Sequence, residues 1–375
     1  APHAFEHRKQ ELEELGFASV TEADVFKSFY SSVLEGGCVK EYLRHGSLAA
    51  VIGETLFVHG AAHESIVGVV PGPDFAAVGK AHYRATMREQ AQHPHTQQAE
   101  QAEQKQAERA PVKPIAMVEG VGDKQDQRFK VVPTVREWVD ELNCFARKQI
   151  RQWDEIPQFC PFNINMERGG NLLLNYGTMW GTEARGCVYN SWLDRDRNYS
   201  PVPLSRAFAD ILQRQGINRV VTGHVPHGEC PTVIKSPGSN TDRPVTVVQC
   251  DTSYSDPEDR ESGFRGKAVS ELYIEDTSSS SGRSTCTIHG FLKRGEAINF
   301  EVESDPFIGR QTSDGRWVKA QVEAAAGAAA GGEASGQGEY VLTRHTGGPF
   351  PSALEYSREH PCTVRQLFAP PRDQH

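Results

Sequence analysis

The sequence predicts an α/β fold, and three observations lead to that prediction. Segments with a helical spacing of apolar residues alternate with short runs of β-branched and aromatic residues. Two of those runs, at 55–58 and 219–222, each lead into a histidine with a glycine beside it. A helix, a glycine stop and a buried strand in succession form the basic unit of α/β proteins. Open sheets of this class bind their ligands at the carboxyl ends of strands, where both histidines would lie.

The composition narrows the class of protein. A chain of 375 residues is long enough for one large domain or two smaller ones. Its hydrophobic content of 38% and mean hydropathy of -0.53 are low for a compact globule, so part of the length is expected to lie outside the packed core. The net charge of -9 argues against general nucleic-acid binding, which needs a basic surface. No apolar run approaches the ~18 residues of a membrane-spanning helix.

The eight cysteines are scattered, and none belongs to a Cys-x-x-Cys pair. This pattern argues against a zinc ribbon or a dithiol redox site. Scattered cysteines in a long chain are typical of free thiols in a reducing, intracellular compartment. The first residues include neither an initiator methionine nor a signal-peptide core, so we expect the chain to be cut from a longer one.

Residues 1–54 are expected to form a helical lead-in to the first predicted strand. Their apolar residues recur at helical spacing, and a glycine pair at 36–37 interrupts the pattern. The positions expected to point inward are Leu12, Leu15, Phe26, Phe29, Tyr30 and Leu34.

Residues 55–276 are expected to form the main domain, interrupted by an insert at 88–112. The insert consists almost wholly of polar residues and alanine, and it cannot bury enough surface to offset the entropy of ordering. We therefore expect it to be disordered. Thr134 and Glu137 have the spacing of a capping box, which predicts the start of a helix over about 135–153.

A second helix is predicted after Pro201, with Gly216 as its stop, directly before the second of the two strands that lead to a histidine. Residues 277–375 are expected to form a β-rich extension, divided by an Ala/Gly linker at 323–337. The further strands predicted from β-branched and aromatic runs are 245–248, 272–274, 285–288, 317–318 and 340–342.

The chemistry of the two strand ends points to a metal ion. His59 follows the strand at 55–58, and His224 follows the strand at 219–222. Neutral imidazole is the commonest protein ligand for transition metals. Taken alone, His59 would be interpreted as a core histidine, but the glycine before His224 lets the backbone approach a small site closely. The pair together favours metal binding, and we expect both imidazoles to point into one pocket.

Several segments occur in an order that has a parallel in a known family. Leu-Phe-Val-His-Gly at 56–60 is followed by Met-Trp-Gly-Thr-Glu-Ala-Arg-Gly at 179–186 and by Val-Val-Thr-Gly-His at 220–224. Asp-Thr-Ser-Tyr at 251–254 then precedes Arg-Gly-Lys-Ala-Val at 265–269. In this order they resemble conserved blocks of the calcineurin-like metallophosphoesterase superfamily, in its phosphoprotein-phosphatase-like branch.

The resemblance extends over residues 40–275 and implies a fold, a site and a reaction. The fold would be part of a four-layer α/β/β/α sandwich. The site would hold two divalent metal ions, usually Mn, Fe or Zn, with His59 and His224 as ligands of the same one. A hydroxide that bridges the two ions would attack a phosphate monoester in line, while both metals and an arginine stabilise the developing charge. The substrate would be a phosphorylated protein or a phosphorylated small molecule.

The resemblance also assigns two candidate catalytic residues. Arg185 would bind the substrate phosphate, since a guanidinium group matches phosphate oxygens bidentately. A surface ion pair is the alternative for Arg185, and Arg195 and Arg197 are competing placements for the clamp. His227 occupies a position where some branches of the superfamily have a further ligand. Here we expect it to support the ligands or to face solvent.

Several of the family's blocks are missing from this sequence. The first three are Asp-x-His, Gly-Asp-x-x-Asp, and Gly-Asn-His-Glu or Gly-Asn-Arg-Asp, and residues 1–54 contain none of them. The glycine pair that usually follows the ligand histidine is changed to Gly-Ala-Ala-His at 60–63. Two histidines cannot hold a dinuclear centre. The chain by itself would hold one metal ion or none, and it is expected to be inactive as an isolated piece.

Two interpretations follow from the missing blocks. In the first, the chain is the C-terminal portion of a metallophosphatase whose remaining blocks lie in a longer polypeptide or in a partner chain. In the second, it is a catalytically inert pseudophosphatase that serves as a structural or scaffold subunit of a larger assembly. The retained histidine and arginine blocks favour the first interpretation.

Overall fold

The chain folds into two compact units, which are described separately. The computed structural model describes residues 2–72, 129–156, 169–177, 186–194, 199–239, 243–253, 268–276, 283–323, 338–346 and 354–369. The smaller unit comprises Ala1–Ser47 and Ala146–Gly170, and the larger comprises Leu48–Phe145 and Asn171–His375. In the described part of the chain, no helix has both the length and the apolar character needed to cross a membrane.

The smaller unit is helical. Thr21 begins its second helix through a capping box with Asp24. Asp154 forms ion pairs with Lys40, at 2.8 Å, and with Arg44, at 3.1 Å. The helices of this unit are α1 (Pro2–Glu14), α2 (Glu22–Ser32), α3 (Cys38–His45) and the last part of α6 (Val135–Glu155).

The helices predicted for the lead-in are confirmed, but most of the predicted inward positions are wrong. Leu12 is buried and packs with Val20 and Val25 in a small apolar cluster. The other residues predicted to point inward are between 41% and 66% exposed, namely Leu15, Phe26, Phe29, Tyr30 and Leu34. Helical spacing identifies an apolar face of a helix, but it does not show whether another element covers that face.

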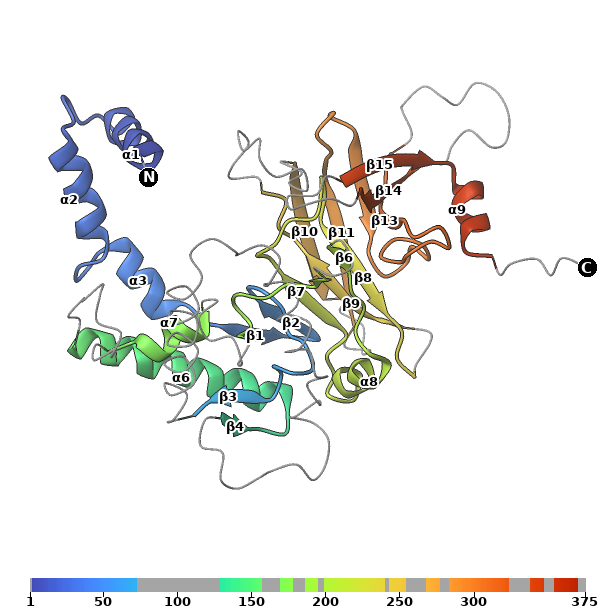
Figure 1. The fold of residues 1–375 in the computed structure, drawn as a ribbon, viewed down its shortest axis with the longest axis horizontal. Helices are drawn as coiled ribbons and strands as arrows, with labels where there is room; N and C mark the ends of the chain where they lie inside the picture. The colour runs from blue at the N-terminus through green and yellow to red at the C-terminus, as the bar shows by residue number, and fades with distance from the viewer. Residues whose placement is uncertain are drawn as a thin grey trace, which may run out of the picture. The chain divides into compact units, whose positions relative to one another are not determined.

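The larger unit is built on a five-stranded mixed sheet of order β1-β2-β7-β9-β8 (Figure 1). The three central strands are parallel to one another, and each outer strand is antiparallel to its neighbour. β1 lies inside the range predicted as a helical lead-in, so the sheet begins earlier than we expected. The bounds are β1 (Ala49–Ile52), β2 (Thr55–Val58), β7 (Arg219–Thr222), β8 (Thr232–Ser236) and β9 (Val245–Gln249).

One face of this sheet packs against α8 (Arg206–Arg214) and the first part of α6. The apolar cluster there includes Trp138 of α6, Leu212 of α8 and Val247 of β9, each at most 1% exposed. Thr134 caps the start of α6, as predicted: the Glu137 N–H donates to Thr134 Oγ1 at 3.2 Å. Both predicted helices are therefore confirmed, and they position the strands that lead to the histidines.

The opposite face packs against two three-stranded antiparallel sheets. Val233 and Val248 point to this side, where they join Ile288 in a second apolar cluster. An antiparallel bridge between Ile298 and Val322 links the two smaller sheets. The described extension therefore packs directly on the main sheet. Its elements are β11 (Ser284–Phe291), β12 (Ala297–Glu301), β13 (Trp317–Gln321), β14 (Tyr340–His345), β15 (Leu354–Glu359) and α9 (Pro361–Leu367). The remaining strand of the two sheets, β10 (Val269–Asp276), comes from the end of the predicted main domain and pairs with β11.

The mixture of helices and sheets confirms the general α/β class. The insert predicted at 88–112 and residues 324–337 of the predicted linker lie outside the described residues. The remaining short elements are β3 (Val69–Pro71), β4 (Phe129–Val131), α7 (Asn171–Gly177), β5 (Leu193–Asp194) and β6 (Ser200–Pro201).

Candidate metal centre

His59 and His224 lie side by side at one edge of the five-stranded sheet. β2 and β7 are parallel neighbours, with Phe57 opposite Val221, so both strands end at the same edge. The Gly223 N–H donates to the carbonyl oxygen of His59 at 2.8 Å. The centroids of the two imidazole rings are 5.1 Å apart, and His59 Nε2 lies 3.2 Å from His224 Nδ1. The two imidazoles therefore lie close together, as a shared pocket requires, and that they line one pocket stays a prediction.

The distance between the two nitrogens fits two ligands of one ion. Imidazole nitrogens bind Zn²⁺ at about 2.0–2.1 Å, and two of them at a roughly tetrahedral angle are ~3.4 Å apart. The observed 3.2 Å between His59 Nε2 and His224 Nδ1 is close to that value. At this distance one nitrogen can donate a hydrogen bond to the other. A metal ion would take the place of the shared proton, so its binding would weaken as the pH falls.

The backbone at His224 is strained. Its φ of +72° lies in the left-handed region, which residues other than glycine rarely adopt. The Val225 N–H donates to the carbonyl oxygen of Gly223 at 3.0 Å, so His224 is the central residue of a γ-turn with positive φ. Turns of this hand are rare and strained. Strained residues persist only where their surroundings hold them, and they cluster at functional sites.

The segment 186–194 lies along one side of the histidine pair. The Gly60 N–H donates to the carbonyl oxygen of Cys187 at 2.7 Å, which holds this segment against the end of β2. The ring of Tyr189 meets the ring of His224 edge-on, with 4.7 Å between centroids. Tyr189 could not be predicted from the sequence, because a single aromatic residue in a loop has no periodic pattern around it.

The next strand brings a carboxylate to the same edge of the sheet. β9 is parallel to β7, and the Cys250 N–H donates to the carbonyl oxygen of Thr222 at 2.7 Å. Asp251 follows directly, and its Oδ1 accepts a hydrogen bond from the Ser253 N–H at 2.8 Å. Asp251 belongs to one of the sequence blocks that resemble the family, but the resemblance assigned no role to it. Among the described residues, no group of three or more His, Cys, Asp or Glu side chains is placed to hold a metal ion.

His227 lies in the protein interior. It is 2% exposed, its Nδ1 is 3.2 Å from Thr232 Oγ1, and its ring centroid is 5.2 Å from that of His345 on β14. Burial, together with the positive charge of Lys319, holds the pKa of His227 well below its usual range. Of the two alternatives expected for His227, the solvent-facing one is wrong, because the loop after β7 is buried against β13 and β14. Its predicted catalytic role stays a prediction.

The phosphate clamp predicted at Arg185 lies outside the described residues, and so do the competing placements Arg195 and Arg197. The described chain resumes at Gly186, directly before the residue whose carbonyl oxygen binds Gly60. The segment that follows Arg185 therefore reaches the end of β2. The role of Arg185 stays a prediction.

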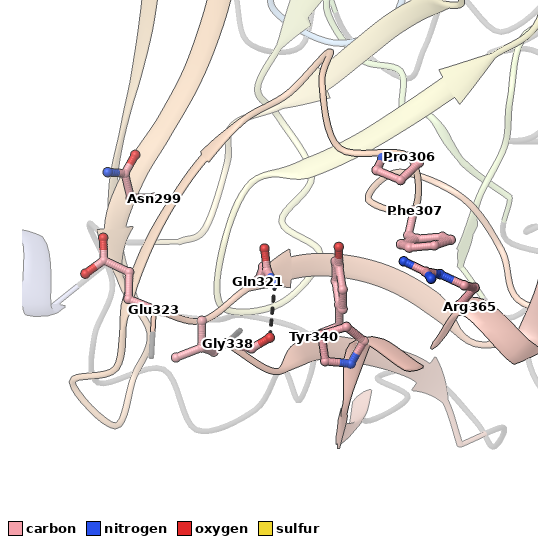
Figure 2. Close-up of a pocket in the computed structure, with 10 residues that line it drawn as sticks. Asn299, Pro306, Phe307, Gln321, Glu323, Gly338, Tyr340 and Arg365 are labelled. Atoms are coloured by element: carbon pink, nitrogen blue, oxygen red, sulfur yellow. Dashed lines mark hydrogen bonds between the residues drawn. The ribbon is translucent and has the colours of Figure 1, made fainter. Parts of the chain in front are cut away.

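A separate pocket of about 410 Å³ lies in the extension (Figure 2). Within its lining, the Gln321 side chain donates to the carbonyl oxygen of Gly338 at 3.0 Å. Its lining also includes Asn299, Phe307, Glu323, Tyr340 and Arg365. The residues predicted for the site do not line this pocket, so the candidate centre rests on the strand ends.

Comparisons with known proteins do not identify a relative of this chain. No family model matches it, and neither a curated protein nor a solved structure does.

Proposed function

We propose that this chain belongs to the catalytic domain of a calcineurin-like metallophosphoesterase, and that His59 and His224 are ligands of one ion in its hydrolytic centre. The observation that carries the proposal is the 3.2 Å distance between His59 Nε2 and His224 Nδ1, at the ends of adjacent parallel strands. The sequence blocks assign the same two residues to a single ion. The distance between their nitrogens supports that assignment independently.

The layers of the larger unit also support the proposal. Helices α6 and α8 pack on one face of the five-stranded sheet, and the sheets of the extension pack on the other. This arrangement is compatible with three successive layers of an α/β/β/α sandwich. That a fourth layer, of helices, completes the sandwich is part of the proposal.

The remaining ligands would come from the family's missing blocks, in a longer polypeptide or in a partner chain. Catalytic zinc sites take three protein ligands per ion, so two imidazoles make a weak site. A bound divalent ion would polarise a phosphoryl oxygen and supply a nucleophile from water at neutral pH. His59 and His224 would hold that ion, and Arg185 would bind the phosphate oxygens of a phosphorylated protein or small molecule.

Binding of Mn²⁺ tests the proposal. Mn²⁺ is chosen because thiolates prefer softer ions, and Cys38 is among the exposed free cysteines. Calorimetric titration of the wild-type chain is expected to show weak binding that is lost in His59→Asn and in His224→Asn. His45→Asn, on the exposed end of α3, is the matched control and is expected to bind as the wild type does. Unchanged Mn²⁺ affinity in both site variants would contradict the proposal.

Hydrolysis of an aryl phosphate separates this proposal from the inert scaffold. The specific observation in favour of a scaffold is that no third ligand joins the pair among the described side chains. For a phosphatase, the chain alone is expected to be inactive with Mn²⁺ and to gain activity when joined to a segment that carries the missing blocks. A scaffold would bind no Mn²⁺ at the pair and would stay inactive in that combination.

A further inference from the structure

A buried lysine anchors the loop that follows His224. Lys319 of β13 is 0% exposed. Its Nζ donates to the carbonyl oxygens of His227 and Cys230, the latter at 2.9 Å, and to Thr232 Oγ1. An ammonium group has three N–H donors, so these contacts use all of them. One side chain of the extension thereby holds the middle and the end of the loop.

Stability alone does not explain a lysine at this position. Among the described residues, no carboxylate forms an ion pair with Lys319 Nζ. Burial lowers its pKa to about 8. Burying a charge without a counter-ion is unfavourable, and an apolar side chain of similar volume would avoid that desolvation. The feature that distinguishes lysine here is its set of three donors, all of which bind the loop.

The loop carries the strained turn at its start. Gln249 of β9 donates to the carbonyl oxygen of Val225, the residue directly after His224. Lys319 holds the loop further along, and the hydrogen bond from Gly223 to His59 holds the strand before the turn. A residue at φ +72° keeps that conformation only when the chain on both sides of it is fixed. These contacts supply that restraint.

We propose that Lys319 is a positioning residue of the candidate centre: its three hydrogen bonds fix the loop that keeps His224 in its strained turn and its imidazole beside His59. This proposal depends on the proposed function in one respect, namely that His59 and His224 bind a metal ion. It assigns to the extension a direct part in building the site, in addition to its packing on the main sheet.

The variant Lys319→Met tests the proposal, since methionine keeps an unbranched side chain and removes all three donors. Hydrogen exchange of the amides at 223–232 is expected to become at least about tenfold faster, and Mn²⁺ affinity to fall about tenfold, as for residues that orient metal ligands. Lys235→Met is the matched control. Lys235 is also a buried lysine, on β8, and its Nζ donates to the carbonyl oxygen of Asp305, outside this loop. We expect it to change global unfolding without a selective effect at 223–232.

The outcomes separate this proposal from the proposed function. Unchanged exchange at 223–232 in Lys319→Met, or an equal change in Lys235→Met, would overturn the positioning role. If the wild type bound no Mn²⁺ while exchange at 223–232 still rose selectively, the proposed metal centre would fail and the positioning of the loop would stand. If Lys319→Met does not fold, Thr232→Val replaces it as the test variant. It keeps the side-chain shape and removes one acceptor, so a smaller change in the same direction is expected, and no change would count against the proposal.

Discussion

Arg219 and Glu303 form an ion pair that joins β7 to the extension. Arg219 is 1% exposed, and its remaining N–H groups bind Thr55 Oγ1 at 3.2 Å and Ser284 Oγ at 2.9 Å. Arg219 begins β7, and His224 follows the other end of the same strand. The strand that delivers His224 is therefore attached to the extension at both ends, through Arg219 at its start and through the anchored loop at its end.

Replacement of Arg219 by methionine is expected to lower the free energy of unfolding by about 3–5 kcal/mol, because Glu303 loses the partner that compensates its charge. Urea unfolding followed by circular dichroism measures this loss. Arg344→Met is the control, since Arg344 and Glu355 form a surface pair whose side chains are 57% and 60% exposed. Its loss is expected to stay below about 1 kcal/mol. Equal losses in the two variants would show that the pair of buried Arg219 and half-buried Glu303 contributes no more than the surface pair.

Unfolding in acid is expected to depend on Glu54, which is 7% exposed. Burial raises the pKa of this carboxyl, but hydrogen bonds from Arg243, Ser284 and Asn218 outweigh burial and lower it to about 2. The ordinary value is 4.5, so the unfolded chain takes up the proton first. The stability from this group is complete above pH 4.5 and is lost as the pH falls toward 2.

Urea unfolding of Glu54→Gln across that pH range checks this expectation. The variant is expected to be less stable than the wild type at neutral pH and to lose less stability on acidification. Glu355→Gln, at an exposed carboxylate, is expected to follow the wild-type profile. A Glu54→Gln variant with the full wild-type acid dependence would show that another group is responsible.

The strands that carry the site could be predicted because the central strands of the sheet are buried on both faces. Such strands are rich in β-branched residues, as in Arg-Val-Val-Thr at 219–222 and Val-Thr-Val-Val at 245–248, and their ends are marked by glycine or polar residues. The position of His59 and His224 at strand ends followed from those runs. That β2 and β7 are neighbours could not be predicted, because pairing between distant segments leaves no local pattern in the sequence.

The sequence pattern could not predict which side chains are buried by a second sheet or helix packed against their own element. Lys319 directly follows the predicted strand at 317–318 and lies in the observed strand β13, but its burial depends on the sheet packed against it. At Phe26 and Tyr30 the sequence pattern predicted burial, but both side chains are more than half exposed. Their rings stack on each other, with 6.1 Å between the centroids. The type and spacing of residues along the chain indicate which face of a helix or strand a side chain occupies. Whether that side chain is exposed depends on the elements that pack against the face.

The two glycines beside the histidines are expected to differ sharply in their tolerance of alanine. A Cβ at Gly60 would lie 2.4 Å from the carbonyl oxygen of Val188 and within 2.9 Å of two further carbonyl oxygens. At Gly223 the nearest atom would be the carbonyl oxygen of His59, at an ordinary 3.7 Å. Gly60→Ala is therefore expected to cost about 1–3 kcal/mol through displaced backbone and to weaken Mn²⁺ binding. Gly223→Ala is expected to stay close to the wild type.

Thermal unfolding and calorimetry of the two glycine variants measure these effects. The pair is internally matched, because each substitution adds one methyl group next to a candidate ligand. If Gly223→Ala were as damaging as Gly60→Ala, the cause would be backbone flexibility at both glycines, and the close approach of Val188 to Gly60 would not be the deciding factor.

Protonation of His345 is expected to weaken the fold in mild acid. Burial lowers its pKa from 6.5 to about 4, and the charge of Lys319 acts in the same direction. The unfolded chain therefore binds the proton at higher pH than the folded chain does. Stability from this group is complete above pH 6.5 and is lost as the pH falls toward 4, by an amount on the order of 3 kcal/mol.

Urea unfolding of His345→Gln between pH 7 and pH 4 tests this expectation, with the pH range set by the pKa of about 4. The variant is expected to lose part of the acid dependence of the wild type. The rest would remain because burial and Lys319 also lower the pKa of His227. His289→Gln, on β11, is the control and is expected to keep the wild-type dependence. Identical pH profiles for the wild type and His345→Gln would mean that His345 is not held neutral, and that the buried side of the extension tolerates a second positive charge beside Lys319.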